Sequence, residues 1–362
     1  MSGLERYLTA LWRGERTALL DRLVLTLLLL PSVVYGATMS LRWWLYRSGI
    51  LPSHRLPCPV ISVGNITVGG TGKTPVTAHI ARFLLARGLK VAVLSRGYGG
   101  ALEGRCAVVS DGTRLLLTPE ECGDEPWLLA SSVPGLAVVI GSDRYRAGVL
   151  AMERLAPDIF LLDDGYQHLR LQRDMNILLM DCSRPLGNRR TLPAGPLREP
   201  VAACRRADLV IYTRCRQGGI PAWQPEAATA FCTAGYRLGP FLRLDVRQVL
   251  TPADLAGLRC VAFAGIAQPE SFFEGLRQAG VVLCATLPFA DHQPYRGEQV
   301  QRLERFAAQH GADCLLTTEK DGVKLAAVGE TLRAKLVVVR LELVFEDDEA
   351  LQQGLHAVTR QA

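Results

Sequence analysis

The sequence predicts an α/β fold: a parallel sheet covered by helices, followed by a smaller α/β lobe and preceded by a helical segment. Short apolar, β-branched runs such as CPVISVGNI and KVAVLSRGYGG alternate with stretches of helical spacing. Hydrophobic residues make up 49% of the 362 residues and charged residues 21%, which suits two domains with buried cores. We expect N-terminal membrane-associated helices over 1–55, the larger core over 56–235 and the smaller lobe over 236–362.

The N-terminal segment is unusually apolar. No charged side chain occurs from Leu23 to Leu41, which is close to the length that crosses a hydrocarbon core. Arginines flank this run and the aromatic cluster WWLY follows it, as at a lipid headgroup region, while Pro31 would kink a helix there. A membrane anchor is favoured over a buried core helix. It is also favoured over a cleaved signal peptide, because mixed charges precede the run.

A glycine-rich loop, TVGGTGKTP, stands between the strand CPVISVGNI and the helical stretch VTAHIARFLLARG. In this strand–loop–helix context, backbone N–H groups hold phosphate oxygens. Lys73 would reach the outer phosphates and Thr74 would place its hydroxyl on Mg²⁺. The sequence therefore predicts a P-loop NTPase-like core, although Thr67 stands where the usual pattern has its first glycine. The other loop residues expected to bind nucleotide are Gly69, Gly70, Thr71 and Gly72.

Two further strand ends carry candidate site residues. KVAVLSRGYGG completes a β-α-β unit and ends in Arg96 and Tyr98, at the edge where open parallel sheets bind ligands. The strand in PDIFLLDDGYQHL ends in Asp163 and Asp164, which we expect to organise Mg²⁺. A simple turn is the alternative, because Asp-Asp-Gly is also turn chemistry. His168 fits a structural hydrogen-bonding role and a catalytic role equally well.

Three other segments supply polar candidates. GDEPWLLA puts Asp124 just before an apolar helix, where a carboxylate caps the helix or serves a site. DHQ supplies His292 in a loop far along the chain. LPAGPLREP carries Arg198 and Glu199, which either contact phosphate and metal or pair on the surface.

Composition excludes several function classes. The net charge of +6 and the isoelectric point near 8.8 are compatible with an anionic membrane or a phosphorylated ligand. They are too weak to indicate nucleic acid, and no nucleic-acid-binding signature occurs. The 10 cysteines include no pair at the two-residue spacing of a zinc or redox site, so we expect buried thiols in a reducing compartment.

Nine segments, in this order along most of the chain, resemble the tetraacyldisaccharide 4′-kinase (lipid A 4′-kinase) family: SVGNITVGGTGKTP, LSRGYGG, GDEPWLLA, DRYRAG, LLDDGYQHLRLQRD, LPAGPLREP, AFAGIAQPESFF, DHQPY and TTEKDGVKL. The resemblance implies ATP- and Mg²⁺-dependent phosphorylation of the 4′-hydroxyl of a tetraacyl glucosamine disaccharide 1-phosphate, giving lipid IVA in lipid A biosynthesis. It implies an acylated disaccharide lipid and a membrane surface as partners, at the cytoplasmic face of the inner membrane. No obligate protein partner is expected.

The resemblance also implies roles for individual residues. It puts the catalytic base at Asp124, assisted by His292, with Lys73 at the phosphates. The residues that would organise metal and phosphate are Thr74, Asp163, Asp164 and Glu199, with His168 beside them. Those that would contact phosphates or substrate are Arg96, Tyr98, Arg144 and Arg198.

Two rival functions remain for comparison. A nucleotide-hydrolysing switch or partner-loading ATPase would use the loop without a lipid acceptor, but it gives no account of the apolar N-terminus. TTEKDG also lacks the Lys-x-Asp spacing of a guanine-binding signature. A membrane-tethered binding module with a decayed site is disfavoured, because Lys73, Thr74 and the Asp-Asp pair are intact.

Overall fold

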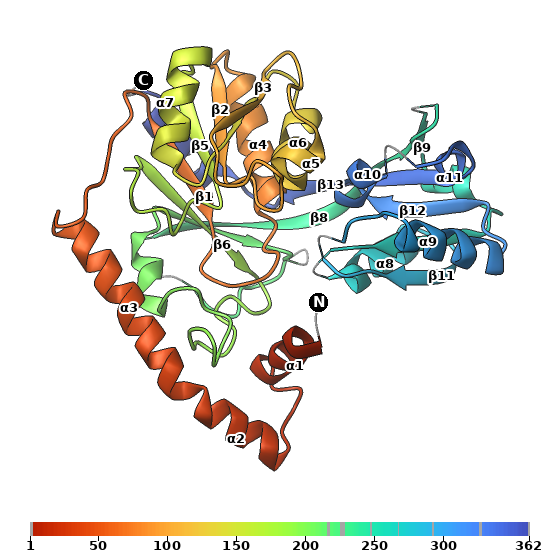
Figure 1. Cartoon of the computed structure of the whole chain (residues 1–362), viewed down its shortest axis with the longest axis horizontal. Coiled ribbons are helices and arrows are strands. Elements are labelled where there is room, and N and C mark those ends of the chain that lie inside the picture. Colours follow the sequence, from red (N-terminus) through yellow and green to blue (C-terminus); the bar gives the residue numbers. More distant parts are fainter. Residues whose placement is uncertain are drawn as a thin grey trace.

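The structure is a computed structural model that describes residues 3–215, 218–224, 229–246, 248–266, 268–291, 293–325 and 328–360. One continuous sheet, in the order β11-β10-β12-β13-β8-β7-β6-β1-β5-β2-β4-β3, runs through two lobes (Figure 1). This confirms the predicted α/β class with a parallel-dominated sheet.

The larger lobe holds the phosphate loop. Its strands are β1 (Val60–Gly64), β2 (Val91–Ser95), β3 (Ala107–Asp111), β4 (Ala137–Ile140), β5 (Ile159–Asp163), β6 (Met175–Asp181) and β7 (Leu209–Thr213). Its helices are α4 (Lys73–Leu85), α5 (Pro119–Cys122), α6 (Asp124–Ser132), α7 (Arg144–Leu155) and the 3₁₀ helix η1 (Val201–Arg206). Apart from the antiparallel edge strand β3, its strands pair in parallel, because helices connect them.

Both faces of this sheet are buried, which explains why the strands read as unbroken apolar runs. On one face, Val76 and Ile80 of α4 pack with Ile61 of β1. On the other, α7 packs through Ala147 against the alternate residues of β2 and β5, such as Leu94. The lobe is therefore a three-layer structure whose strands end at a common edge, and that edge carries the site.

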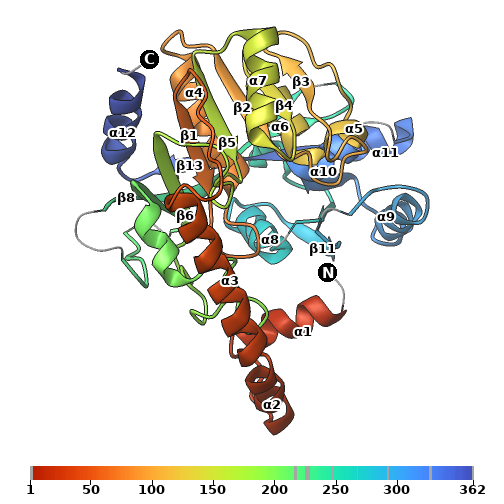
Figure 2. The ribbon, with the colours of Figure 1, turned by 60° about the vertical axis from the view of Figure 1, so that its left-hand side comes forward.

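Two long strands connect the lobes. β8 (Ala230–Arg243) begins as a parallel neighbour of β7 and continues as an antiparallel partner of β13 (Leu336–Phe345). The boundary predicted at residue 235 falls inside β8. The last helix, α12 (Glu349–Thr359), returns to the larger lobe, where Leu351 and Leu355 join its core (Figure 2). The end of the chain thus packs with the larger lobe.

The smaller lobe is an α/β unit. Its strands are β9 (Val249–Leu250), β10 (Cys260–Ala264), β11 (Leu283–Pro288) and β12 (Cys314–Thr318). Its helices are η2 (Pro252–Leu255), α8 (Pro269–Gln278), α9 (Glu298–Gln309), α10 (Glu319–Lys324) and α11 (Glu330–Lys335). β10, β11, β12 and β13 pair in parallel, so their carboxyl ends also meet at one edge.

The N-terminal segment forms α1 (Gly3–Trp12), α2 (Leu19–Leu27) and α3 (Leu29–Arg47), which extend from the larger lobe (Figures 1 and 2). The break at Leu28 lies just before Pro31, whose ring clashes with the carbonyl four residues earlier. The stretch Leu19–Arg47 has a mean hydropathy of 1.8 and is long and apolar enough to cross a membrane. Only 11% of its most apolar 18-residue stretch is buried, so the segment is not a core helix.

Candidate active site

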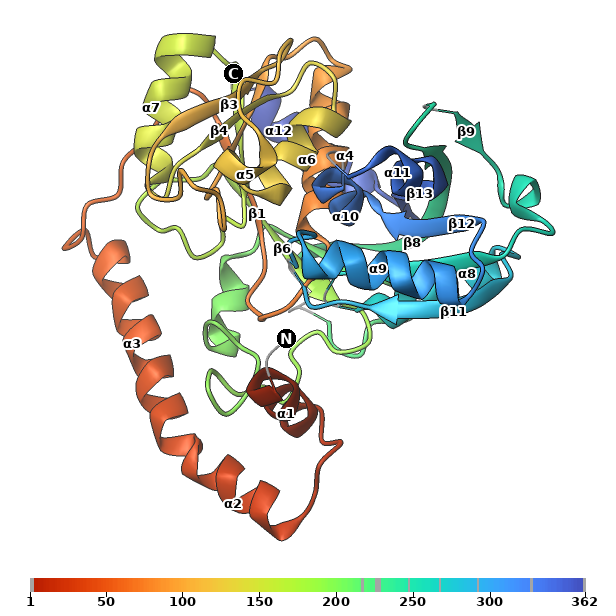
Figure 3. The ribbon, with the colours of Figure 1, turned by 45° about the vertical axis from the view of Figure 1, so that its right-hand side comes forward.

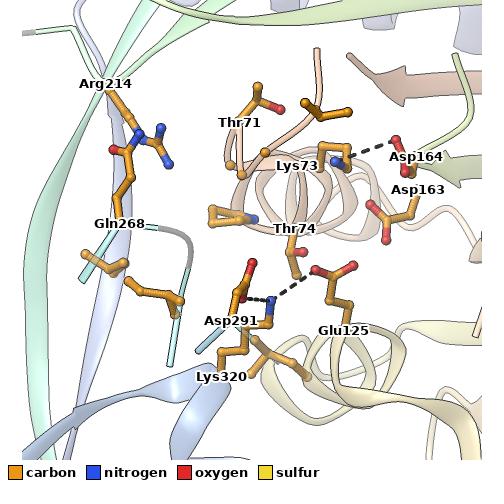
Figure 4. Close-up of a pocket in the computed structure, with 18 of the residues that line it drawn as sticks. Thr71, Lys73, Thr74, Glu125, Asp163, Asp164, Arg214, Gln268, Asp291 and Lys320 are labelled. Atoms are coloured by element: carbon orange, nitrogen blue, oxygen red, sulfur yellow. Dashed lines mark hydrogen bonds and ion pairs between the residues drawn. The ribbon is translucent and has the colours of Figure 1, made fainter. Parts of the chain in front are cut away.

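A cavity of about 1680 Å³ is lined by residues of both lobes. The larger lobe contributes the phosphate loop and the ends of β2 and β5; the smaller lobe contributes α8, α10 and the loop at Asp291 (Figures 3 and 4). α3 lines the same cavity through Tyr35, Met39 and Arg42. The nucleotide loop and the apolar N-terminal segment therefore face one space.

The phosphate loop is fixed by contacts from three strands. Asn65 Nδ2 donates to Thr71 Oγ1 at 2.8 Å, and Thr213 Oγ1 donates to the Thr71 carbonyl at 2.9 Å. Gly72, at φ 76°, caps α4, and a Cβ there would lie 1.6 Å from the Tyr236 hydroxyl oxygen. Only glycine fits under Tyr236. The N-terminus of α4, which begins at Lys73, is thus held open to the cavity as an anion site.

The structure gives a physical reason for Thr67. This residue is buried and pairs in an antiparallel bridge with Leu197. Flanking bonds extend the pairing, since the Val68 N–H donates to the Pro196 carbonyl and the Arg198 N–H to the Ile66 carbonyl. The φ angle of Thr67 is not positive, so its backbone conformation does not require glycine. The LPAGPLREP segment takes over part of the support of the loop.

The two aspartates after β5 have different environments. Asp164 accepts two bonds from Arg198 Nη1, at 3.2 and 3.1 Å, and lies 3.6 Å from Lys73 Nζ. Burial acts to raise the pKa of Asp164, but Lys73 and Arg198 outweigh it and hold that pKa below its usual value. Burial, with Glu125 and Asp164 adding to it, raises the pKa of Asp163 to about 7. Asp163 is therefore a carboxyl group whose charge is incompletely compensated by the protein.

The residues beside the loop fit a magnesium ion shared with phosphates. Thr74 and Asp163 line the cavity close to Lys73 (Figure 4). Within the described residues, no group of three or more His, Cys, Asp or Glu side chains could hold a metal alone. Mg²⁺ commonly takes one or two carboxylates together with substrate phosphates and water. An under-compensated carboxyl group beside a threonine hydroxyl suits that arrangement.

His168 and Arg144 form a linked pair. The Arg144 N–H, at the start of α7, donates to His168 Nε2 at 3.3 Å. Burial and then the Arg144 charge lower the pKa of His168 to about 4, so the imidazole is neutral near pH 7. Burial lowers the pKa of Arg144 only to about 10, and its guanidinium stays charged at the cavity. Between the two roles open for His168, this geometry favours the structural hydrogen bond.

The other predicted residues divide into two sets. Arg96 and Tyr98 line the cavity and are exposed, with 62% of Tyr98 accessible. Glu199 is not among the lining residues; it is buried, pairs with Arg206 and accepts a bond from Gln167 Nε2 at 3.1 Å. His292 lies outside the described residues.

Asp124 begins α6 and pairs with Lys324 Nζ at 3.0 Å. The neighbouring Glu125 lines the cavity, whereas Asp124 is not among the lining residues.

The sequence reasoning missed the basic residues of α10. Lys320 Nζ lies 3.5 Å from Glu125 Oε1 and 3.2 Å from Asp291 Oδ1 (Figure 4). Both lysines of α10 come from TTEKDGVKL, which is one of the nine segments that carry the family resemblance, but neither lysine was given a role. Their four-residue spacing on a helix after a strand was the available signal. Arg214 and Gln268 also line the cavity and were not predicted.

Comparisons with known proteins identify the family of this chain. The model of the family described as Tetraacyldisaccharide-1-P 4'-kinase matches residues 24–360. Tetraacyldisaccharide 4'-kinase of Pelobacter propionicus is 54% identical over 354 residues, 98% of each chain. That of Geobacter sulfurreducens is 55% identical over 323 residues, 88% of this chain and 90% of the other. A crystal structure of LpxK from Aquifex aeolicus in complex with ATP matches with a TM-score of 0.76 and 33% identity, covering 91% of this chain and 98% of that one. The chain therefore belongs to the tetraacyldisaccharide-1-P 4'-kinase family.

Proposed function

We propose that this chain transfers the γ-phosphoryl group of ATP to the 4′-hydroxyl of a tetraacyl glucosamine disaccharide 1-phosphate, giving lipid IVA. One observation carries the proposal: the phosphate loop and the apolar helix α3 line the same cavity. A lipid whose acyl chains lie near α3 can extend its sugar head group toward the loop. Family membership and the ATP complex of the Aquifex aeolicus relative support the choice of substrates.

On the nucleotide side, the work is positioning and charge neutralisation. The loop N–H groups and the start of α4 would hold the phosphates, and Lys73 would offset the charge that spreads over the moving phosphoryl group. Arg144 and Arg198, both at the cavity, would add positive charge. Thr74 and Asp163 are the residues that would hold Mg²⁺, which neutralises phosphate charge when bound.

On the acceptor side, a sugar hydroxyl is a poor nucleophile until its proton is removed. We assign that role to Asp124, with His292 assisting, as the family resemblance implies. Base catalysis of this kind contributes about 10²–10⁴-fold. Asp124 lies on the first turn of α6, next to Glu125, which lines the cavity. A small movement of this turn or of α10 would bring Asp124 to the acceptor.

We further propose that α2 and α3 lie on the cytoplasmic face of the inner membrane. One face of α3 binds the larger lobe: Ser32 Oγ donates to the Thr191 carbonyl at 2.7 Å, and the Tyr35 hydroxyl donates to the Arg198 carbonyl at 3.0 Å. A helix that packs against the protein along one side is better suited to lie at the membrane interface than to cross the bilayer. Across α2 and α3, nine large apolar side chains are exposed: Leu19, Leu20, Leu23, Leu27, Leu30, Val33, Val34, Leu41 and Trp44.

A transfer assay tests the proposed activity. The protein is incubated with γ-labelled ATP, Mg²⁺ and a detergent-dispersed disaccharide lipid acceptor, and the label is counted on lipid and as free phosphate. Label on the lipid is expected. Free phosphate alone would favour the nucleotide-hydrolysing switch, and label in neither fraction would favour a binding module. Lys73→Met should abolish transfer, while Lys90→Met, at an exposed position, serves as the matched control.

A further inference from the structure

Helix α10 is fixed firmly to the smaller lobe. It follows β12 directly, and the Thr318 hydroxyl accepts a bond from the Asp321 N–H at its start. The Asp321 side chain is fully buried and accepts bonds from the Gly265 N–H at 2.9 Å and the Tyr295 hydroxyl at 3.1 Å. The position of α10 therefore follows the smaller lobe as a unit.

The lysines of α10 reach across to the larger lobe. Lys320 and Lys324 are four residues apart and share a helix face, next to α6 (Figure 3). The Lys324 ammonium, on a side chain only 8% exposed, lies 3.0 Å from Asp124 Oδ2. Lys320 bridges Glu125 of the larger lobe and Asp291 of the smaller. One short helix thus holds both acidic residues that begin α6.

The ion pairs of Lys320 and Lys324 offset repulsion between neighbouring carboxylates. Asp124, Glu125 and Asp291 gather around the two lysines of α10, and Glu125 and Asp291 line the cavity that also contains the phosphate loop. Like charges in a partly buried site repel each other. Burial acts to lower the pKa of Lys320, but Glu125 and Asp291 outweigh it and raise that pKa, so the ammonium stays charged. Without the lysines, the acidic turn of α6 would be driven away from the phosphates.

We propose that Lys324 is a positioning residue for the base Asp124, and that Lys320 positions the loop at Asp291 against Glu125. The position of the smaller lobe is thereby transmitted to the base through α10. This inference rests on the proposed role of Asp124. A plain structural staple between the lobes is the competing explanation, and it predicts a loss of stability without a specific loss of turnover.

Steady-state kinetics of Lys324→Met separate these explanations. We expect kcat to fall about 10–100-fold, because a misplaced base costs about that much, while the KM for ATP changes less than about threefold. Lys324→Arg, which keeps the charge, should recover most of the turnover. Arg340→Met is the control, since Arg340 pairs with Glu319 of the same helix at 2.8 Å, and it should leave kcat unchanged. Thermal unfolding of each variant reports stability separately.

A double-mutant cycle completes the test. In an Asp124→Asn background, Lys324→Met should add little further loss, because its effect passes through Asp124. Equal losses in both backgrounds, or a Lys324→Met kcat equal to that of the unaltered protein, would overturn the inference while leaving the proposed function intact. An Asp124→Asn enzyme with full turnover would instead remove the base assignment itself. If Lys324→Met does not fold, Lys320→Met, at the more exposed lysine, must lower kcat without raising the KM for ATP.

Discussion

The two walls of the cavity are built differently. On the loop side, Lys73 and Arg198 both pair with Asp164, and all three belong to the larger lobe. On the opposite side, Lys324 of the smaller lobe contacts Asp124 of the larger, and Lys320 contacts both lobes. The ion pairs of the loop side form within one lobe. The ion pairs between α10 and α6 form only when the two lobes are close enough for these helices to touch.

This difference predicts that the two walls affect ATP binding and turnover differently. Because the charged residues of the loop wall all belong to the larger lobe, we expect phosphate binding to depend little on the position of the smaller lobe. The α10 wall changes whenever the lobes move, since two continuous strands, β8 and β13, are the main connection between them. We therefore expect substitutions in the loop wall to reduce nucleotide affinity and turnover together, and substitutions in the α10 wall to reduce turnover alone.

The largest effect is expected at the centre of the loop wall. Lys73→Met removes the cation proposed to contact the outer phosphates and should lower kcat/KM for ATP by about 10³-fold. ATP affinity, measured by isothermal titration, should fall as well. Unchanged ATP affinity in this variant would contradict the prediction that the loop wall, unlike the α10 wall, binds ATP.

A second prediction concerns the shape of the loop. Gly72→Ala introduces a Cβ that would lie 1.6 Å from the Tyr236 hydroxyl oxygen, at a φ of 76°. Strain of about 1–3 kcal/mol should weaken ATP binding by about 10–100-fold. Adding Tyr236→Phe removes the overlapping oxygen and should restore part of the affinity. Gly49→Ala, at a similar φ of 77° with no neighbour within 4 Å, should leave ATP binding unchanged.

The loop wall could be predicted from the sequence because its parts are contiguous. Strand, glycines, Lys73 and helix follow one another along the chain, and the Asp-Asp pair ends a clear apolar strand. The α10 wall could not, because its contacts join residues far apart in the sequence, such as Lys320 and Glu125. No periodicity reveals that α10 lies beside α6.

The surroundings of single residues also depend on contacts that local sequence rules do not contain. Thr67 looked like a departure from a glycine pattern until its bridge to Leu197 supplied the reason. Asp124 and Glu125 are adjacent in sequence, yet the helix start turns only Glu125 into the cavity lining. The boundary at residue 235 was placed where the alternation of predicted strands and helices gives way to a second α/β unit, and β8 spans that position.

A smaller effect is expected at the membrane face, which lies apart from both walls. Replacing Leu23, Leu27 and Leu30, all more than half exposed, by Gln should reduce binding to anionic lipid vesicles about tenfold or more. Transfer to a detergent-dispersed acceptor should persist. Gln at Ile220, Val249 and Val282, exposed apolar residues outside the N-terminal helices, is the control and should not change vesicle binding in a flotation assay.

The smallest effect is a pH dependence of stability. The pKa of His168 is about 4 in the folded protein, against an ordinary value of 6.5 for histidine. Between these two pH values the folded protein therefore binds fewer protons than the unfolded chain. His168 therefore contributes stability above pH 6.5 that is lost as the pH falls toward 4. In His168→Gln, whose amide oxygen can still accept from the Arg144 N–H, the difference in urea-unfolding free energy between pH 7 and pH 5 should shrink. An unchanged or larger difference would contradict this assignment.

In the proposed reaction, the phosphate loop of one wall and the carboxylate paired with Lys324 in the other act on one acceptor hydroxyl. The most direct test is a structure with a non-hydrolysable ATP analogue and the disaccharide lipid bound. We expect the 4′-hydroxyl between the terminal phosphate and Asp124, within about 3.2 Å of the carboxylate. A complex in which another side chain contacts that hydroxyl, while Asp124 stays remote from it, would contradict the assignment of Asp124 as the base.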